Sequence, residues 1–438
     1  MLLLTIAVVF VLFVISYMIF DKDLLAPPTV VSLVFLFSCL CALYNEERWG
    51  MVFSSKSLGI IAAGIIATII GGMIGAFLYN LRRGGSFSFL HTKTEAQLIN
   101  VSGEKTFLVI VFQVVTIILI ITHILRVTEL SNWISAITTY RGIVTRTAEN
   151  NDYSMSILTK NMAEFSRSAG IVYAYIVGNN LVAAKKKISL IWVPVLLYTA
   201  TTFLLGDRSN MIRLWVVALV TAYTIHRRSV GWERSRETVK IIRRMAISVV
   251  AIGVIFVGFR GIVGRTEKSD PFYYLTFYAG SPIAVLNQVW DSAIVKPAVF
   301  GQRILFYFNQ STTALFGFPG KYVFYYPYFY SSGGAFIGNA PTAFRPAFVE
   351  FGFWGFFLFF VIMGAFFTVF YCKCRERKGR SPIDMRLLIY AYVAYVFFMY
   401  FYSTFFDFLS HVFIKYVIEF LVIRWALFDL QIAKRAKR

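Results

Sequence analysis

The chain has 438 residues, of which 58% are hydrophobic, 18% aromatic and 15% charged, and its mean hydropathy is +0.68. Soluble domains carry roughly 25% charged and about 45–50% apolar residues, so this composition excludes a water-soluble globular protein. The 43 Lys and Arg outnumber the 22 Asp and Glu, which gives a net charge of +21. In a membrane protein such an excess marks the cytoplasmic loops and requires no nucleic-acid partner.

Apolar runs long enough to cross a bilayer follow one another along the chain. A membrane-spanning helix needs about 20 predominantly apolar residues, and runs of about this length predict an all-α integral membrane protein with eleven transmembrane helices. The whole of 1–438 is expected to form a single polytopic membrane domain. The runs lie at about 2–20, 29–44, 58–78, 106–125, 168–184, 188–205, 211–226, 245–259, 351–372, 387–405 and 411–428.

Basic connectors between these runs set the expected orientation. The most basic ones lie at 185–187, 226–244, 372–380 and 433–438. Lys and Arg in short loops stay on the cytoplasmic side, and all four connectors fall on one side when the helices are counted alternately. The expected topology therefore has the N-terminus outside, the C-terminus inside and the connector 79–105 inside.

The same count places two long connectors outside, 126–167 and 260–350. The second has 91 residues, far more than a usual connection, and loops of this length tend to be functional. It contains two apolar pieces, 272–290 and 304–318, that are too short or too interrupted by polar residues to span. We expect them to form interfacial or re-entrant helices within a large external loop.

Several common signatures are missing from the sequence. There is no phosphate-binding loop, no H-E-x-x-H and no G-x-S-x-G, which disfavours chemistry driven directly by ATP. The four cysteines form two C-x-C pairs without a His cluster, so no metal site is expected. The GGMIG sequence at 71–75 lies inside an apolar run, where small residues let helices approach closely, and it is expected to serve helix packing.

Arginines at the predicted outer face are the first group of candidate functional residues. Arg208 lies in the GDRSN sequence between two apolar runs, Arg260 and Arg265 follow the next outward run, and Arg303 and Arg345 lie in the long loop. A guanidinium stays charged and offers a planar fork of donors that matches phosphate oxygens. The set favours a phosphorylated ligand over the alternative of separate anchors to lipid head groups or acidic neighbours.

An aromatic stretch in the long loop is the second group. Six Tyr and Phe side chains occupy seven positions from 324 to 330. Aromatic faces stack on sugar rings, although tyrosines also form the interfacial belt of any membrane protein. The candidate saccharide-binding residues are Arg303, Tyr322, Tyr325, Tyr326, Tyr328 and Tyr330.

The third group of candidate functional residues consists of side chains that can act as an acid or a base. Glu350 precedes a predicted span, and Asp407 and His411 lie four residues apart, a spacing that places them on one helical face. A carboxylate beside an imidazole raises its basicity, so the pair is suited to accept a proton from a sugar hydroxyl. A structural pair at a helix end is the alternative. In the last run, Lys415 and Glu419 are expected to form an ion pair.

The stretch GNAPTAFRPAFVEFGFWG at 338–355, with GDR at 206–208 and YAGSP at 278–282, resembles the Wzy-type oligosaccharide repeat-unit polymerases of bacterial O-antigen and capsule synthesis. In that family a Gly-Asn, a Thr, an Arg and an acidic-Phe-Gly-x-x-Gly sequence lead into a late transmembrane span. The matching residues are Gly338, Asn339, Thr342, Arg345, Phe351, Gly352 and Gly355. Glu350 stands where Asp is common, and Ala340-Pro341 replaces the usual aromatic residue.

The resemblance implies a metal-independent and cofactor-free glycosyltransferase in the bacterial cytoplasmic membrane, with its active site at the outer face. It would transfer a growing polysaccharide from undecaprenyl pyrophosphate to the non-reducing end of an incoming lipid-linked repeat unit. The expected partners are undecaprenyl-pyrophosphate-linked oligosaccharides, membrane lipid and a chain-length regulator. A lipid-linked oligosaccharide flippase and an O-antigen-ligase-like glycosyltransferase are the alternatives.

The resemblance also assigns roles to the three groups of candidates. Pyrophosphate would be bound by Arg208, Arg260, Arg265 and Arg345, which would stabilise the charge of the departing group in place of a metal. The catalytic base would be Glu350, Asp407 or His411. Arg303 and the tyrosines from Tyr322 to Tyr330 would hold sugar.

Overall fold

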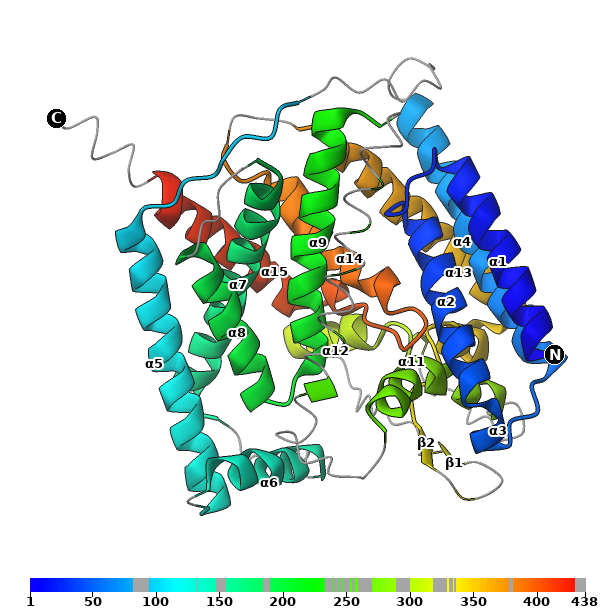
Figure 1. The fold of residues 1–438 in the computed structure, drawn as a ribbon, viewed down its shortest axis with the longest axis horizontal. Helices are drawn as coiled ribbons and strands as arrows, with labels where there is room; N and C mark the ends of the chain where they lie inside the picture. The colour runs from blue at the N-terminus through cyan, green and yellow to red at the C-terminus, as the bar shows by residue number, and fades with distance from the viewer. Residues whose placement is uncertain are drawn as a thin grey trace. The chain divides into compact units, whose positions relative to one another are not determined.

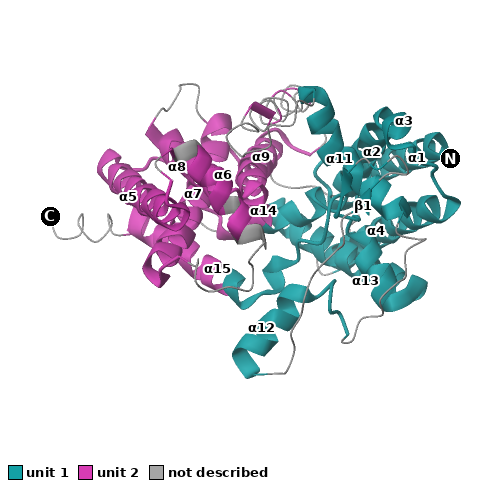
Figure 2. Cartoon of the chain, turned by 90° about the horizontal axis from the view of Figure 1, so that it is seen from below, with its two compact units in different colours: residues 1–91, 269–376, 393–413 teal, residues 92–268, 377–392, 414–438 magenta. Residues whose placement is uncertain are grey.

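The computed structural model describes most of the chain as two compact units of helices (Figure 2). The described residues are 1–81, 94–130, 132–146, 155–183, 190–232, 270–288, 300–317, 329–330, 334, 336–377 and 381–429, with a few single positions between 239 and 258. Unit 1 comprises 1–91, 269–376 and 393–413, and unit 2 comprises 92–268, 377–392 and 414–438.

The helices and strands follow in chain order (Figure 1). Those of unit 1 are α1 (Leu2–Ile19), α2 (Pro27–Tyr44), α3 (Glu46–Trp49), α4 (Ser55–Leu81), α11 (Pro271–Gln288), α12 (Phe306–Phe316), β1 (Phe329–Tyr330), β2 (Phe336–Gly338), α13 (Phe344–Cys374) and the short 3₁₀ helix η4 (Asp407–Leu409). Those of unit 2 are α5 (Gly103–Thr128), α6 (Trp133–Arg146), α7 (Ile157–Ala183), η2 (Leu190–Trp192), α8 (Val193–Leu204), α9 (Arg208–Val230) and the π-helical turn η5 (Trp425–Asp429). Two helices, α14 (Met385–Phe398) and α15 (His411–Arg424), each have residues that belong to unit 1 and residues that belong to unit 2.

Five helices are long and apolar enough to cross a membrane: α1, α2, α4, α5 and α13, with mean hydropathies of 1.9 to 2.9 in their most apolar windows. They confirm five of the predicted runs and support an integral membrane protein. The apolar run 387–405 is not one helix, because α14 ends at Phe398 and turns follow. The run 245–259 lies largely outside the described residues, and the total of eleven spans stays a prediction.

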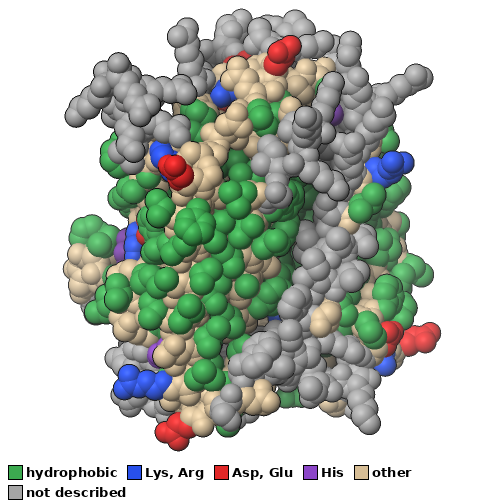
Figure 3. Space-filling model, turned by 60° about the vertical axis from the view of Figure 1, so that its left-hand side comes forward, with side chains coloured by type: hydrophobic (Ala, Val, Ile, Leu, Met, Phe, Trp, Pro, Cys, Tyr) green, Lys and Arg blue, Asp and Glu red, His purple; other side chains and the backbone are tan. Residues whose placement is uncertain are grey.

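Helix α5 exposes several large apolar side chains and buries polar ones. Phe107, Leu108 and Ile118 are more than half exposed, whereas Gln113 and Thr116 are fully buried. The amide of Gln113 donates to the backbone oxygen of Pro194 at 3.1 Å. Apolar side chains cover the middle of one face of the molecule, with charged groups mainly near its upper and lower edges (Figure 3). Such a large apolar surface is typical of contact with lipid.

Unit 1 is built on the close packing of α4 against α13, which lie side by side (Figure 1). A Cβ atom on Gly71 would lie 2.1 Å from the backbone oxygen of Val361, and one on Gly364 would lie 2.5 Å from that of Thr68. Only glycine allows this approach of the two backbones. The expectation that the GGMIG sequence serves helix packing is confirmed.

The two apolar pieces of the connector 260–350 form helices α11 and α12. Helix α11 packs on α2, where the Ser38 hydroxyl donates to the backbone oxygen of Ala279 at 2.6 Å. The short antiparallel pair of β1 and β2 follows α12 in the chain. The position of this connector outside the membrane stays a prediction.

Helix α7 is the central element of unit 2, since every residue from Ser168 to Asn180 is buried. It packs along α9 and also contacts α8 and α5. Polar side chains lie at both ends of this buried stretch. Arg167 precedes it, and Asn179 and Asn180 at its other end hydrogen-bond to the extended segment 97–99. One cavity is lined by Arg167, and another is lined by Tyr175 and Asn179.

Candidate functional site

One cavity in the described part of unit 2 is lined by Arg167 and has about 530 Å³ of space, part of it open to solvent. Its walls come from the start of α7, the end of α8 and the turn before α9. The polar lining residues are Lys160, Glu164, Arg167, Tyr198, Thr201, Thr202 and Asp207. We refer to this cavity as the Arg167 pocket.

Arg167 is held in this pocket by two tyrosines and faces a carboxylate. Its Nε donates to the Tyr198 hydroxyl at 3.2 Å and its Nη1 to the Tyr416 hydroxyl at 2.5 Å, and the guanidinium carbon lies 5.0 Å from the centre of the Tyr416 ring. Nη2 lies 3.9 Å from Oδ2 of Asp207, beyond hydrogen-bond distance. The side chain is 21% exposed, so the guanidinium is oriented by neutral oxygens and still faces the cavity.

Asp207 belongs to the GDR sequence and caps the N-terminus of α9. Its Oδ1 accepts from the backbone N–H of Asn210 at 3.1 Å, as a helix-capping Asp does. Arg208, the residue chosen from the sequence, is the first residue of α9 and is half-buried, but it is not among the residues that line the Arg167 pocket. The structure therefore places Asp207, the neighbour of the predicted residue, in the cavity.

Further ionised groups lie on the same helices. The Lys415 ammonium contacts Oε2 of Glu164 at 2.5 Å and Oδ1 of Asn161 at 2.8 Å. The Glu419 carboxylate accepts from the Ser168 hydroxyl at 2.5 Å. The expected ion pair between Lys415 and Glu419 is wrong, because packing of α15 beside α7 offers Lys415 a carboxylate on the other helix.

A second arginine extends the polar contacts into the interior of unit 2. Nη1 of Arg213, on α9, donates to the Tyr392 hydroxyl at 2.8 Å, and its guanidinium carbon lies 4.7 Å from the centre of that ring. The Tyr392 ring in turn lies 6.1 Å from that of Tyr416. Arginine, tyrosine and acidic groups thus form a continuous cluster on α7, α9, α14 and α15.

In unit 1, Arg345 lies in the segment that carries the family resemblance. It is 5% exposed in the first turn of α13. The preceding Thr342 is fully buried with φ of 65°, and its N–H donates to the backbone oxygen of Tyr402 at 3.1 Å. A β-branched residue rarely adopts a positive φ, and such strain concentrates at functional sites.

Glu350 contacts the backbone of Arg303 by a hydrogen bond. The Glu350 carboxylate accepts from the N–H groups of Arg303 and Ile304, the latter at 3.1 Å. The non-helical φ of 67° at Gly352 ends the first part of α13 just after Glu350. This contact holds the turn before α12 against α13 and occupies the carboxylate of one predicted base.

The premise that Asp407 and His411 share a helical face is wrong. Asp407 starts the 3₁₀ helix η4, Ser410 is extended with ψ of 154°, and α15 begins only at His411. The interruption removes the i, i+4 relation that the spacing predicted. Nδ1 of His411 lies 3.0 Å from the hydroxyl of Ser311 on α12 instead.

The remaining sequence candidates fall mostly outside the described residues. These are Arg260, Arg265, Tyr322, Tyr325, Tyr326 and Tyr328. Tyr330 is described: it lies in β1, is 55% exposed and has its ring 5.8 Å from that of Phe336. Among the described residues, no group of three or more His, Cys, Asp or Glu side chains could hold a metal ion.

Arg167 was missed by sequence reasoning. It lies at the last position of the predicted outer connector 126–167, directly before an apolar run, which is the placement that drew attention to Arg208. Its partners Tyr198 and Tyr416 are 31 and 249 residues away. Comparison with protein-family models, curated proteins and solved structures found no match.

Proposed function

We propose that the protein is a membrane-embedded glycosyltransferase that polymerises lipid-pyrophosphate-linked oligosaccharide repeat units at the outer face of the bacterial cytoplasmic membrane. The observation that carries the proposal is the Arg167 pocket, in which an arginine and hydroxyl groups line a cavity between apolar helices. Six of the ten lining residues, Arg167 and Asp207 among them, lie in connectors that the positive-inside count assigns to the outer face, and the others lie near the end of the predicted run 188–205. The sequence resemblance in 338–355 supports the same reaction.

Arg167 has the donors that a departing pyrophosphate requires. A guanidinium has five N–H groups, and in the described part of the chain two of those on Arg167 donate to tyrosines. Nη2 faces Asp207 at 3.9 Å, beyond hydrogen-bond distance, and it can donate to phosphate oxygens. Charge-assisted bonds from arginine to phosphate are strong and geometrically specific, and a donor fixed before the reaction stabilises developing charge most effectively.

In the proposed reaction, the bond between the anomeric carbon of the donor sugar and the pyrophosphate oxygen breaks. A bond forms between that carbon and a hydroxyl oxygen of the acceptor repeat unit, and the hydroxyl proton passes to a base. We assign Asp207 as this base, because it lines the pocket with a carboxylate that is 35% exposed. Glu164 lines it too, but its side chain pairs with Lys415 and is only 18% exposed. The Asp207 carboxylate accepts from the N–H and the side-chain amide of Asn210 and is more open to solvent than that of Glu164.

The test is incubation of the purified protein with a lipid-linked repeat unit in the presence of a chelator, followed by gel separation of the products. We expect a ladder of polymer, and we expect Arg167→Gln to weaken it strongly. The variants Arg208→Ala and Arg345→Ala test separately the two arginines that the resemblance assigns to pyrophosphate, and under that assignment both abolish the ladder. No ladder from an authentic substrate with correctly folded protein would overturn the polymerase proposal. Wild-type ladders from both variants would overturn only the assignment of pyrophosphate to these two arginines.

The flippase alternative is favoured by one observation. Ionised groups lie on α7, α9 and α15, among them the Lys415–Glu164 pair and Glu419, and charges within spans are typical of transporters. Vesicles that contain the protein and a fluorescent lipid-linked repeat unit distinguish the two activities. Movement of the lipid between leaflets without polymer formation would identify a flippase.

A further inference from the structure

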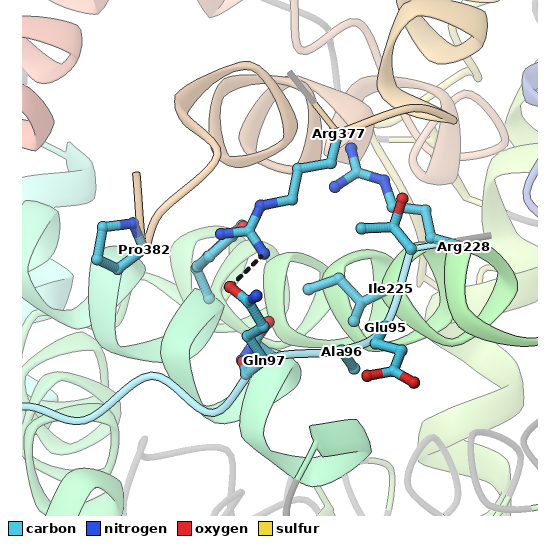
Figure 4. Close-up of a pocket in the computed structure, with 10 residues that line it drawn as sticks. Glu95, Ala96, Gln97, Ile225, Arg228, Arg377 and Pro382 are labelled. Carbon is cyan, nitrogen blue, oxygen red and sulfur yellow. Dashed lines mark hydrogen bonds between the residues drawn. The ribbon is translucent and has the colours of Figure 1, made fainter. Parts of the chain in front are cut away.

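A second cavity of unit 2 lies beside Tyr175 and Asn179 on α7 and has about 290 Å³ of space, part of it open to solvent (Figure 4). Its lining comes from segment 94–97, from Tyr175 and Asn179 on α7, from the end of α9 and from the residues around Pro382. Two of the lining residues are arginines, Arg228 and Arg377. We refer to this cavity as the Arg377 pocket.

One wall of the pocket is an extended segment fixed by hydrogen bonds. The Thr94 N–H donates to the backbone oxygen of Arg228 at 2.9 Å, and Asn179 Nδ2 donates to that of Gln97 at 2.9 Å. Asn180 then binds both the N–H and the carbonyl of Ile99 at 2.9 Å. Because these contacts tie the segment to α7 and α9, the pocket is held open by backbone and amide groups of unit 2.

The two arginines are held in different ways. Arg228 is 5% exposed and pairs with Asp384, its Nη2 lying 2.8 Å from Oδ2. Asp384 also accepts from the N–H of Arg386 at 3.1 Å at the start of α14. This carboxylate is therefore committed to Arg228 and to the helix start.

The hydrogen bonds of Arg377, within the described residues, go to neutral oxygens. Its Nη2 donates to the backbone oxygen of Ser381 at 2.8 Å and its Nη1 lies 3.4 Å from Oε1 of Gln97. Both guanidinium groups lie on one side of the pocket, whereas the Glu95 carboxylate on the opposite wall points away from them (Figure 4). Because Arg228 is paired with Asp384, the cationic group that the pocket offers to a ligand is the guanidinium of Arg377.

From this geometry we infer that the Arg377 pocket binds a phosphate group. A phosphate oxyanion matches the planar fork of Arg377, and Asn179, Tyr175 and Gln97 add polar groups to the same lining. Six of its ten lining residues, including both arginines, belong to the connectors 79–105, 226–244 and 372–380, which the positive-inside count assigns to the cytoplasmic face. Basic pockets between helices on that face bind anionic head groups. The phosphate would come from an anionic lipid or from solution.

The experiment measures the melting temperature, Tm, of the full-length protein in detergent as a function of added probe. The probes are dioctanoyl phosphatidylglycerol, inorganic phosphate, and two controls: dioctanoyl phosphatidylcholine and chloride at matched ionic strength. A ligand that binds the folded state raises Tm in a saturable manner, which gives its Kd. The test variant is Arg377→Gln. The matched control is Arg424→Gln, which alters an arginine of unit 2 that pairs with Asp429 at 3.5 Å and does not line the pocket.

We expect saturable binding of phosphatidylglycerol or of phosphate, with a Kd about tenfold higher in Arg377→Gln, a change of about 1.4 kcal/mol. Arg424→Gln should bind as the wild type does. Saturation by the lipid alone identifies a head group, and saturation by inorganic phosphate identifies a free anion.

Three results would overturn the inference: no saturable Tm increase with either probe, an equal increase with phosphatidylcholine or chloride, or an unchanged Kd in Arg377→Gln. If Arg377→Gln does not fold, Arg377→Met takes its place, because methionine keeps much of the side-chain length but has neither charge nor N–H donors. An unchanged Kd in that variant would likewise overturn the inference.

Discussion

Substitution of Arg167 by glutamine tests the Arg167 pocket most directly. The change removes the hydrogen bonds to Tyr198 at 3.2 Å and to Tyr416 at 2.5 Å, together with the charge that faces Asp207. Hydrogen bonds to charged groups contribute about 1.5–3 kcal/mol each. Solvent in the open pocket can rehydrate the two hydroxyls, so we expect a loss of about 2–4 kcal/mol in the free energy of unfolding.

The effect on activity should exceed the effect on folding. Loss of one preorganised donor to the charge that develops in a transition state lowers the rate by about 10²–10³-fold. The assay is the initial rate of ladder formation, with Tm measured on the same samples. Tyr416→Phe removes one hydrogen bond but keeps the guanidinium, so it should retain the ladder at a rate reduced by less than about tenfold.

The matched control for this substitution is Arg126→Gln, which alters an exposed arginine at the end of α5 that does not line the pocket. It should leave both rate and Tm unchanged. A folded Arg167→Gln protein whose rate stays within about threefold of the wild type would refute the assignment of Arg167 to the leaving group. If the glutamine variant does not fold, Arg167→Lys keeps the charge, and a wild-type rate in that variant would refute the need for the planar fork.

Two further substitutions test the packing of unit 1 and the catalytic base. Gly71→Leu should lower Tm strongly, because its Cβ would lie 2.1 Å from the Val361 oxygen and overpacking costs about 1–3 kcal/mol or more. The control is Gly59→Leu on the same helix, where a Cβ meets nothing within 4 Å. Equal Tm values for the two variants would contradict the packing argument. Asp207→Asn should abolish the ladder at unchanged Tm, because asparagine caps a helix as well as aspartate but cannot act as a base. Glu350→Gln should retain the ladder, since its amide oxygen can still accept from the backbone N–H groups of residues 303 and 304. The reverse pattern of activities would assign the base to Glu350.

Hydropathy and small-residue patterns predicted the local features correctly. The runs at 2–20, 29–44 and 58–78 became α1, α2 and α4. The GGMIG sequence became a close helix contact with α13. Both depend on the residues of one segment, because a span is apolar along its own length and a glycine allows close approach whatever helix lies opposite.

Charge pairing was predicted less well, because spacing along the chain does not fix which side chains meet. The four-residue spacing of Asp407 and His411 required a continuous helix, and the extended backbone at Ser410 interrupts it. Lys415 was assigned to Glu419 on its own helix, but it contacts Glu164 on α7. An ammonium pairs with the carboxylate that helix packing places beside it, and that carboxylate need not lie on its own helix.

The sequence alone therefore determined that this is an apolar, helical membrane protein, and it placed the excess of basic residues in connectors. It predicted eleven spans, of which the structure supports five as helices long and apolar enough to cross a membrane. The net charge of +21 is explained by the basic connectors, which are expected on the cytoplasmic side, without a nucleic-acid partner. Only the tertiary structure decided which arginines face a cavity: Arg167 through tyrosines 31 and 249 residues away, and Arg377 through segment 94–97. The physical reason is that hydropathy is set residue by residue, whereas a binding pocket exists only where helices distant in sequence pack together.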